Sequence, residues 1–142
     1  MKAIISGAGI GGLTAALCLH NIGYDVEVYE VVSDLKPLGV GINLLPHGAA
    51  VLYNLGLGKK LDESGVRTQA IEYRTKFGHV ITSDPRGVDA GFEFPQYSIH
   101  RGILQFILLD AARLRLGPDA IKTGAGISSF SQNDIGVTAH LV

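Results

Sequence analysis

A glycine-rich turn near the N-terminus constrains the fold of this chain more than any other feature. The turn directly follows a short apolar run at residues 3–6 and precedes an apolar pattern of helical spacing at residues 10–22. It matches the pattern G-x-G-x-x-G with Gly7, Ala8, Gly9, Ile10, Gly11 and Gly12. Residues 26–30 supply a second strand pattern. This order predicts a fully buried strand, a helix and a second, parallel strand, which together form one Rossmann-like crossover.

The spacing of the glycines predicts a dinucleotide site on this crossover. Gly7 permits the tight turn, Gly9 lets a diphosphate approach the backbone, and Gly12 allows the helix to pack closely on the strand. The helix N-terminus offers N–H groups and a partial positive charge to the diphosphate. Glu30 ends the second strand, where a carboxylate accepts hydrogen bonds from ribose hydroxyls and repels a 2′-phosphate. FAD or NAD is therefore favoured over NADP. The alternatives to a dinucleotide site are a glycine-rich turn without a ligand and a glutamate on the surface.

The rest of the chain predicts further helices and strands. Residues 31–47 are irregular and residues 84–95 form a loop. Helices are predicted over residues 46–55 and 103–116, the second largely buried. The remaining strands are an antiparallel hairpin at 71–75 and 80–83, followed by short runs at 127–131 and 137–142. The predicted fold class is α/β, a Rossmann-like domain with a parallel sheet and a small antiparallel hairpin insertion.

Composition and charge exclude several classes of function. Twelve Lys and Arg face thirteen Asp and Glu, and no basic block is present, so we expect no nucleic-acid partner. No apolar run is long enough to cross a membrane. The one cysteine, Cys18, reads as a core residue in a reducing compartment, which favours the cytoplasm. We predict no metal site, because no two of the five histidines have ligand spacing: His20, His47, His79, His100 and His140.

Two further segments resemble class A flavoprotein monooxygenases, which hydroxylate aromatic compounds. Residues 39–46, leading into Leu55-Gly56-Leu57, resemble the loop and helix after the second strand of that family. Residues 97–105 resemble its I-H-R-x-x-L-Q segment. Within the family, residues 37–43, 85–88 and 95–102 are similar to the branch that acts on 5-methylphenazine-1-carboxylate. Neighbouring branches act on salicylate and related aromatic acids.

The resemblance implies FAD as the cofactor and assigns residues to its parts. Glu30 would bind the adenosine ribose, and the backbone at Ile127 would lie near adenine. Arg101 would lie near the diphosphate and ribityl chain with Gln105 close by, since a guanidinium can bind two diphosphate oxygens at once. The alternative for Arg101 is a solvent-exposed side chain at a helix end.

Two glycines outside the turn have an open interpretation. Gly39 and Gly41 either let the backbone approach the isoalloxazine ring or only shape a turn.

The chemistry implied by the resemblance uses NAD(P)H to reduce the flavin and O₂ to hydroxylate a small aromatic substrate. The cofactor performs the difficult steps, so no side chain is predicted to be catalytic. Residues 1–142 would form the FAD-binding domain, with the family's substrate sheet and G-D-A segment absent after Val142. We therefore expect an N-terminal portion that does not complete the active site. The alternatives are a non-catalytic dinucleotide-binding module and half of an NAD-dependent dehydrogenase.

Overall fold

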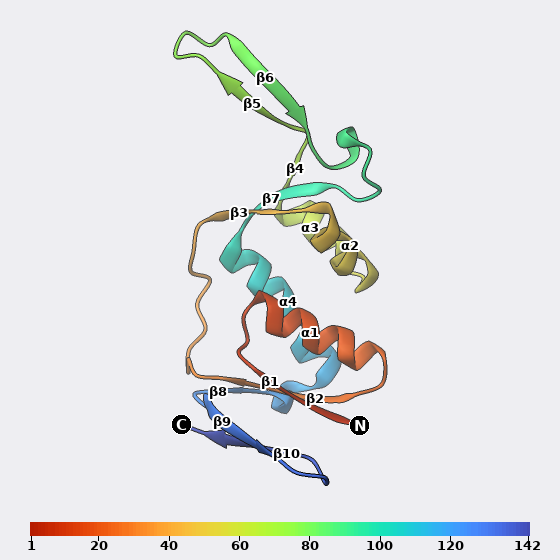
Figure 1. The fold of residues 1–142 in the computed structure, drawn as a ribbon, viewed down its shortest axis with the longest axis vertical. Helices are drawn as coiled ribbons and strands as arrows, with labels where there is room; N and C mark the ends of the chain where they lie inside the picture. Colours follow the sequence, from red (N-terminus) through yellow and green to blue (C-terminus); the bar gives the residue numbers. More distant parts are fainter. The chain divides into compact units, whose positions relative to one another are not determined.

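The computed structural model describes residues 1–142, which form two compact units (Figure 1). The first unit joins the two ends of the chain, Met1–Leu38 and Leu104–Val142. The second unit is the middle of the chain, Gly39–Ile103. Each unit has its own sheet and buried apolar residues. The extent of the FAD-binding domain, predicted as residues 1–142, stays a prediction.

The first unit contains the parallel crossover that the sequence predicts. Three parallel strands run in the order β1-β2-β8, with bounds Lys2–Ser6, Asp25–Glu30 and Ile121–Thr123. Helix α1 (Ile10–Asn21) connects β1 to β2 and buries Leu13, Ala16 and Leu17. Helix α4 (Arg101–Leu116), which belongs to this unit from Leu104 onward, leads to a short 3₁₀ turn, η2 (Pro118–Ala120), and then to β8. The predicted α/β class is confirmed.

A two-stranded hairpin lies on the opposite side of the sheet from α1 (Figure 1). It pairs β9 (Ile127–Gln132) with β10 (Val137–Leu141) in antiparallel fashion. The predicted burial of β1 is wrong: this strand is at the edge of its sheet, and its Ile4 side chain is 40% exposed. An edge strand has a neighbour on one side only, whereas β2 lies between two strands and buries Val26 and Val28.

The second unit is built on an antiparallel sheet of three strands. Its order is β3-β7-β4, with bounds Gly41–Leu44, Gln96–His100 and Val66–Thr68. Two helices belong to the same unit, α2 (Pro46–Asn54) and α3 (Gly58–Ser64). The buried apolar side chains include Leu52, Leu55, Leu57, Leu61 and Ile99.

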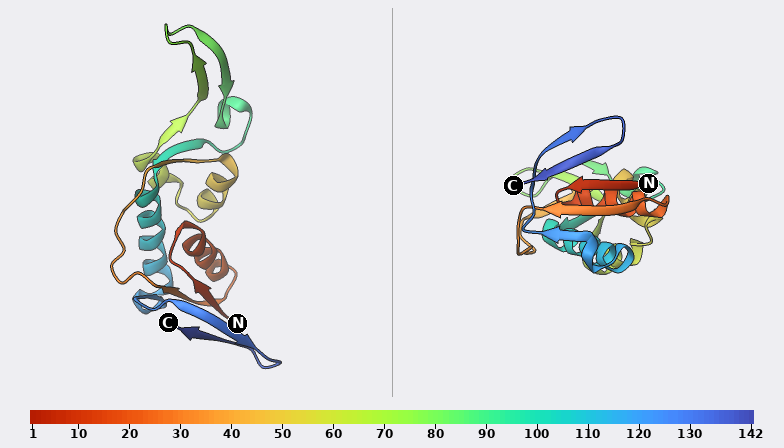
Figure 2. Two further views of the ribbon diagram at one scale, coloured as in Figure 1. Left: turned by 60° about the vertical axis from the view of Figure 1, so that its left-hand side comes forward. Right: turned by 90° about the horizontal axis from the view of Figure 1, so that it is seen from below.

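The predicted hairpin is present in the second unit as β5 (Ala70–Arg74) and β6 (Val80–Pro85). It extends away from the rest of its unit (Figure 2). The irregular region predicted at residues 31–47 contains strand β3, and the loop predicted at 84–95 contains a 3₁₀ turn, η1 (Gly87–Ala90). No helix in either unit is long and apolar enough to cross a membrane.

A buried tyrosine anchors a polar network in the second unit. The hydroxyl of Tyr97 donates to Asp62 Oδ1 at 2.5 Å and lies 2.8 Å from the hydroxyl of Tyr53. Arg67 donates to both oxygens of Asp62, at 2.8 and 2.9 Å. The hydrogen bonds from Arg67 and Tyr97 lower the pKa of the Asp62 carboxyl, and burial is the main cause that raises the pKa of Tyr97. This network links β7 and β4 to α2 and α3.

Candidate dinucleotide-binding site

The glycine turn has the geometry that its sequence predicts. Gly7 adopts φ +98°, which side chains disfavour, and its N–H donates to the carbonyl of Tyr29 at 2.7 Å. A Cβ atom at Gly12 would collide with the carbonyl oxygen of Gly7, so helix and turn can approach this closely only with glycine there. A Cβ at Gly9 or Gly11 would meet no atom within 4 Å. The outer side of the turn is therefore open to a ligand.

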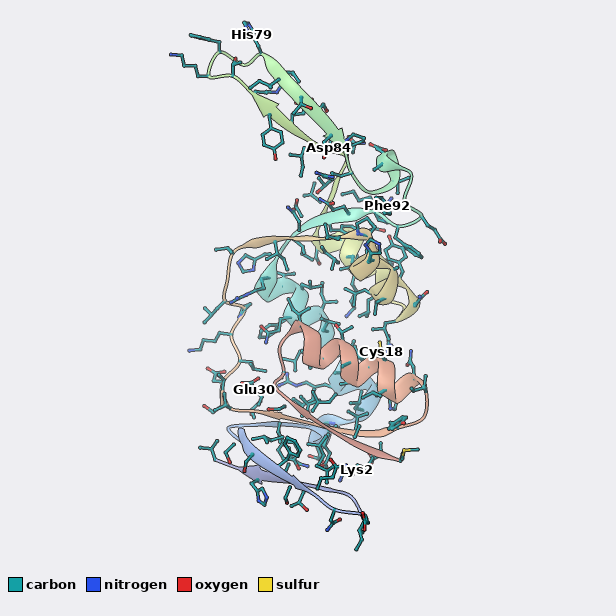
Figure 3. The ribbon with its side chains drawn as sticks, viewed as in Figure 1. Lys2, Cys18, Glu30, His79, Asp84 and Phe92 are labelled. Carbon is teal, nitrogen blue, oxygen red and sulfur yellow. The ribbon has the colours of Figure 1, made fainter.

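Glu30 lies at the end of β2 (Figure 3). Backbone N–H groups hold its carboxylate on two sides. Its Oε2 accepts from the N–H of Ala8 at 2.7 Å, and its Oε1 accepts from the N–H of Val32 at 2.9 Å. The residue is 9% exposed. Each carboxylate oxygen has a second lone pair, so Glu30 can still accept hydrogen bonds from ribose hydroxyls. Its orientation is thus fixed before any ligand binds.

Gln105 contacts the same peptide group from helix α4. Its Nε2 donates to the carbonyl oxygen of Ala8 at 2.9 Å. Ala8 is fully buried, and its peptide N–H and C=O are held by the side chains of Glu30 and Gln105 respectively. The sequence places Gln105 close to the cofactor; the structure gives it a contact with the protein backbone of the glycine turn.

A cavity of about 370 Å³ lies at the carboxyl ends of β1 and β2. It brings together three residues predicted from the sequence, namely Gly7, Glu30 and Ile127. The predicted site does not include the other lining residues, which are Ser6, Tyr29, Val31, Gly126 and Val142. Apart from Val142, each adjoins a predicted residue in the sequence, which is the signal that could have found them. This position matches the rule that ligands of α/β sheets bind beyond the carboxyl ends of the strands.

Gly126 allows the two walls of this cavity to approach each other. A Cβ atom at Gly126 would lie 2.9 Å from Cβ of Val31 and 3.3 Å from Cγ2 of Val142. The backbone N–H of Val142 donates to the carbonyl of Gly126 at 2.8 Å. The wall that carries Ile127 is therefore fixed by direct backbone contact.

A charged cluster lies beside the cavity on the strands of the same sheet. Oε1 of Glu27 is 2.8 Å from Nζ of Lys122 and 3.0 Å from Nζ of Lys2, and its Oε2 accepts from the hydroxyl of Tyr29 at 2.9 Å. These contacts, led by the hydrogen bond from Lys122, lower the pKa of the Glu27 carboxyl to about 2. The cluster links all three strands through β1, β2 and β8.

The remaining predicted residues, Gly41 and Arg101, come together within the second unit. Gly41 pairs with His100 between β3 and β7, and the N–H of Arg101 donates to the carbonyl of Val40 at 3.0 Å. Gly39 adopts φ +135°, and a Cβ there would lie 2.7 Å from Nε of Arg101. The side chain of Arg101 thus lies directly against the backbone of Gly39.

No protein-family model matches the chain. Its homologues are FAD-dependent aromatic monooxygenases, and the chain corresponds to their N-terminal portion. Phenazine 1,6-dicarboxylic acid hydroxylase PhzS of Lysobacter antibioticus is 45% identical over 138 residues, which cover 96% of this chain and 34% of the relative. For 3-amino-4-hydroxybenzoate 2-monooxygenase of Streptomyces cremeus the identity is 36% over 137 residues, covering 86% of this chain and 35% of the relative.

A solved structure supports the same class. HpxO of Klebsiella pneumoniae, complexed with FAD and uric acid, matches with a TM-score of 0.83 and 30% identity, covering 99% of this chain and 35% of that chain. The resemblance stated from the sequence is confirmed. FAD is the cofactor bound in the HpxO structure and named for the FAD-dependent urate hydroxylase of Klebsiella pneumoniae, which is 43% identical over 74 residues. The chain spans about a third of the length of the relatives that it matches.

Proposed function

We propose that these residues bind the adenosine and diphosphate portion of FAD within a monooxygenase that hydroxylates a small aromatic acid. The observation that carries the proposal is the fixed peptide of Ala8, which Glu30 and Gln105 hold beside an open glycine turn and a cavity. The similarity to FAD-dependent hydroxylases over nearly the whole chain supports the same cofactor.

The residues present fit this cofactor. The open space over Gly9 and Gly11 is a cradle that a side chain would fill, and the N-terminus of α1 offers N–H groups to an anion. The carboxylate of Glu30 suits ribose hydroxyls and disfavours a 2′-phosphate. The cavity beside Glu30 and Ile127 has apolar and backbone groups for the adenine. We assign Glu30 to the ribose, the turn to the diphosphate and Ile127 to the base.

The part played by these residues is to bind and orient the cofactor. FAD, when bound, supplies the chemistry that carries electrons from NAD(P)H to O₂ and oxygen to the substrate. Arg101 provides a positive charge for the diphosphate, and Gly41, where a Cβ atom would meet no atom within 4 Å, lets backbone approach a ligand. No side chain of the chain is assigned a proton transfer or a nucleophilic attack.

We propose a phenazine carboxylate as the substrate of the whole protein. The relative named for a phenazine dicarboxylic acid shares 45% of aligned residues, compared with 36% for the relative named for an aminohydroxybenzoate. The proposal includes a cytoplasmic location, supported by Cys18, which has no disulfide partner in the chain.

Ligand competition tests the cofactor assignment. The purified chain is titrated with FAD, ADP, FMN and NAD⁺ by calorimetry. We expect FAD and ADP to bind and FMN to fail, because FMN lacks the adenosine that Glu30 and the cavity would hold. Binding of NAD⁺ in preference to FAD would support the dehydrogenase alternative and contradict the proposal. ADP should bind about as tightly as FAD, because the groups described here hold only the portion that the two ligands share, and failure of both to bind would also contradict the proposal.

A further inference from the structure

His100 makes one hydrogen bond through its ring and leaves the other ring nitrogen without a partner. It is the last residue of β7 and directly precedes Arg101. Its Nε2 lies 3.0 Å from the carbonyl oxygen of Gly39. A carbonyl oxygen can only accept, so Nε2 carries the hydrogen in this contact. Nδ1 is screened from solvent and has no hydrogen-bond partner.

The unpartnered Nδ1 indicates that residue 100 is a histidine because of the hydrogen bond from Nε2 to Gly39 and not because of its packing. A buried polar atom without a partner reduces stability, and such atoms in folded proteins call for a specific explanation. Leucine would fill similar space without this cost. Histidine has an N–H group at the Nε2 position, which leucine lacks, and this group donates to the carbonyl of Gly39.

The side chain of Arg101 packs against the backbone of Gly39. A Cβ atom at Gly39 would be 2.7 Å from Nε and 3.2 Å from Cζ of Arg101. The φ of +135° at Gly39 is a conformation that only glycine adopts readily, so this backbone depends on its contacts. Three contacts hold it here: the ring of His100 on Gly39, the N–H of Arg101 on Val40, and the pairing of Gly41 with His100.

We propose that His100 is a positioning residue for Arg101. Its Nε2–H fixes the carbonyl of Gly39, the Gly39 peptide supports the guanidinium, and the guanidinium is thereby held ready for an anionic ligand. The proposal rests on the proposed function, in which Arg101 binds the FAD diphosphate. His100 itself does not touch the cofactor, and its whole effect on binding passes through Arg101.

Replacing His100 with amide side chains of two lengths, glutamine and asparagine, tests this assignment. In His100→Gln the side-chain N–H can take the place of Nε2–H, whereas in His100→Asn it reaches only as far as Nδ1. We expect His100→Asn to weaken FAD binding roughly fivefold, the usual effect of losing one neutral hydrogen bond, and His100→Gln to stay within about twofold of the wild type. Equal affinities for the two variants would overturn the proposal.

A double-mutant cycle shows whether the effect passes through Arg101. The affinity of His100→Asn/Arg101→Ala for FAD should equal that of Arg101→Ala alone, because the positioned group is already gone. Additive losses would mean that His100 acts by another route and would refute the proposal. Circular dichroism identifies a variant that fails to fold, in which case His100→Leu replaces His100→Asn in the cycle.

A readout without FAD separates this proposal from the proposed function. The Nε–H resonance of Arg101 in a ¹H–¹⁵N spectrum should exchange slowly with solvent in the wild type and in His100→Gln, and faster in His100→Asn. If the wild-type chain fails to bind FAD, the proposed function fails, and this resonance still decides the role of His100. An Arg101 signal that is the same in all three proteins would sink the positioning role even if FAD binds.

Discussion

At the scale of single residues, Glu30 has two kinds of partner to satisfy. In the structure it holds the N–H groups of Ala8 and Val32, and the proposed function adds the ribose hydroxyls. We predict that Glu30→Ala weakens FAD binding by about 1.5 to 3 kcal/mol, because a charged acceptor is lost. A flavin fluorescence titration measures the change. Glu30→Gln, which keeps one acceptor oxygen, should fall between the wild type and alanine. An unchanged dissociation constant for Glu30→Ala would remove this residue from the site.

Two glycines of the same turn should respond to substitution in opposite ways. A side chain at Gly9 enters open space, whereas one at Gly12 meets the carbonyl of Gly7. We therefore predict that Gly9→Val abolishes FAD binding and leaves the thermal unfolding midpoint within a few degrees of the wild type. Gly12→Ala should instead lower the midpoint, since helix and turn must separate. Thermal unfolding followed by circular dichroism, paired with FAD titration, checks both. A Gly9→Val variant that unfolds would contradict the open geometry.

The site residues that could be predicted are those whose role follows from local sequence. Gly7, Gly12 and Glu30 belong to one short motif, so their spacing already indicates their geometry. The contact of Gln105 with Ala8 joins residues 97 positions apart, and no local pattern reports it. Gly126 is needed because Val31 lies close to it, which becomes visible only once β2 and β9 are placed.

At the scale of elements, the same distinction between local and distant contacts separates what was predicted from what was missed. The crossover of β1, α1 and β2 and the hairpin of β5 and β6 are each continuous in sequence, and both were predicted. The sheet β3-β7-β4 was not, because its strands are short and pair across long stretches of chain; Ser98 hydrogen-bonds to Asn43, 55 positions away. Gly41 at the start of β3 also weakens the local strand signal.

The cluster around Glu27 makes the stability of the parallel sheet depend on pH. Its carboxyl has a folded-state pKa of about 2 against an ordinary value of 4.5. A lowered pKa contributes stability above the unfolded value, and this contribution is lost as the pH falls from about 4.5 toward 2. We predict that Glu27→Gln removes this part of the acid sensitivity.

Urea unfolding at several pH values measures the effect. The gap in stability between the wild type and Glu27→Gln should be largest near neutral pH and close toward pH 2. Asp62, whose pKa is also lowered, titrates in both proteins and cancels in the comparison. A gap that does not change with pH would show that the contacts with Lys2 and Lys122 do not couple to folding.

At the scale of the whole molecule, exposed apolar side chains occur in both units, and one group of them lies on strands of the first unit. Ile4, Phe130, Ile135 and Val137 are exposed on β1 and on the hairpin of β9 and β10. A cavity of about 610 Å³ lies between the start of β1 and the turn of that hairpin. The open edge of β1 adds unpaired backbone groups. We therefore expect the 142 residues, taken alone, to be prone to association.

The last prediction compares these residues alone with the same residues joined to the remainder of a homologue. The chain aligns with about a third of PhzS, so two thirds of that relative have no counterpart in the residues described. The groups found here suit adenosine and diphosphate, and none of them encloses a flavin ring and an aromatic substrate together. The chain alone should therefore bind FAD weakly. It should also form no hydroxylated product, because oxygen transfer to a substrate requires water to be excluded. A fusion to the C-terminal part of PhzS should bind FAD tightly, lose the tendency to associate, and hydroxylate a phenazine carboxylate with NADH or NADPH.

Product is measured by chromatography, with salicylate as the second substrate and Gly9→Val in the fusion as the matched control. Coupled hydroxylation by the 142 residues alone would refute the prediction, since it would require a complete active site within the two units.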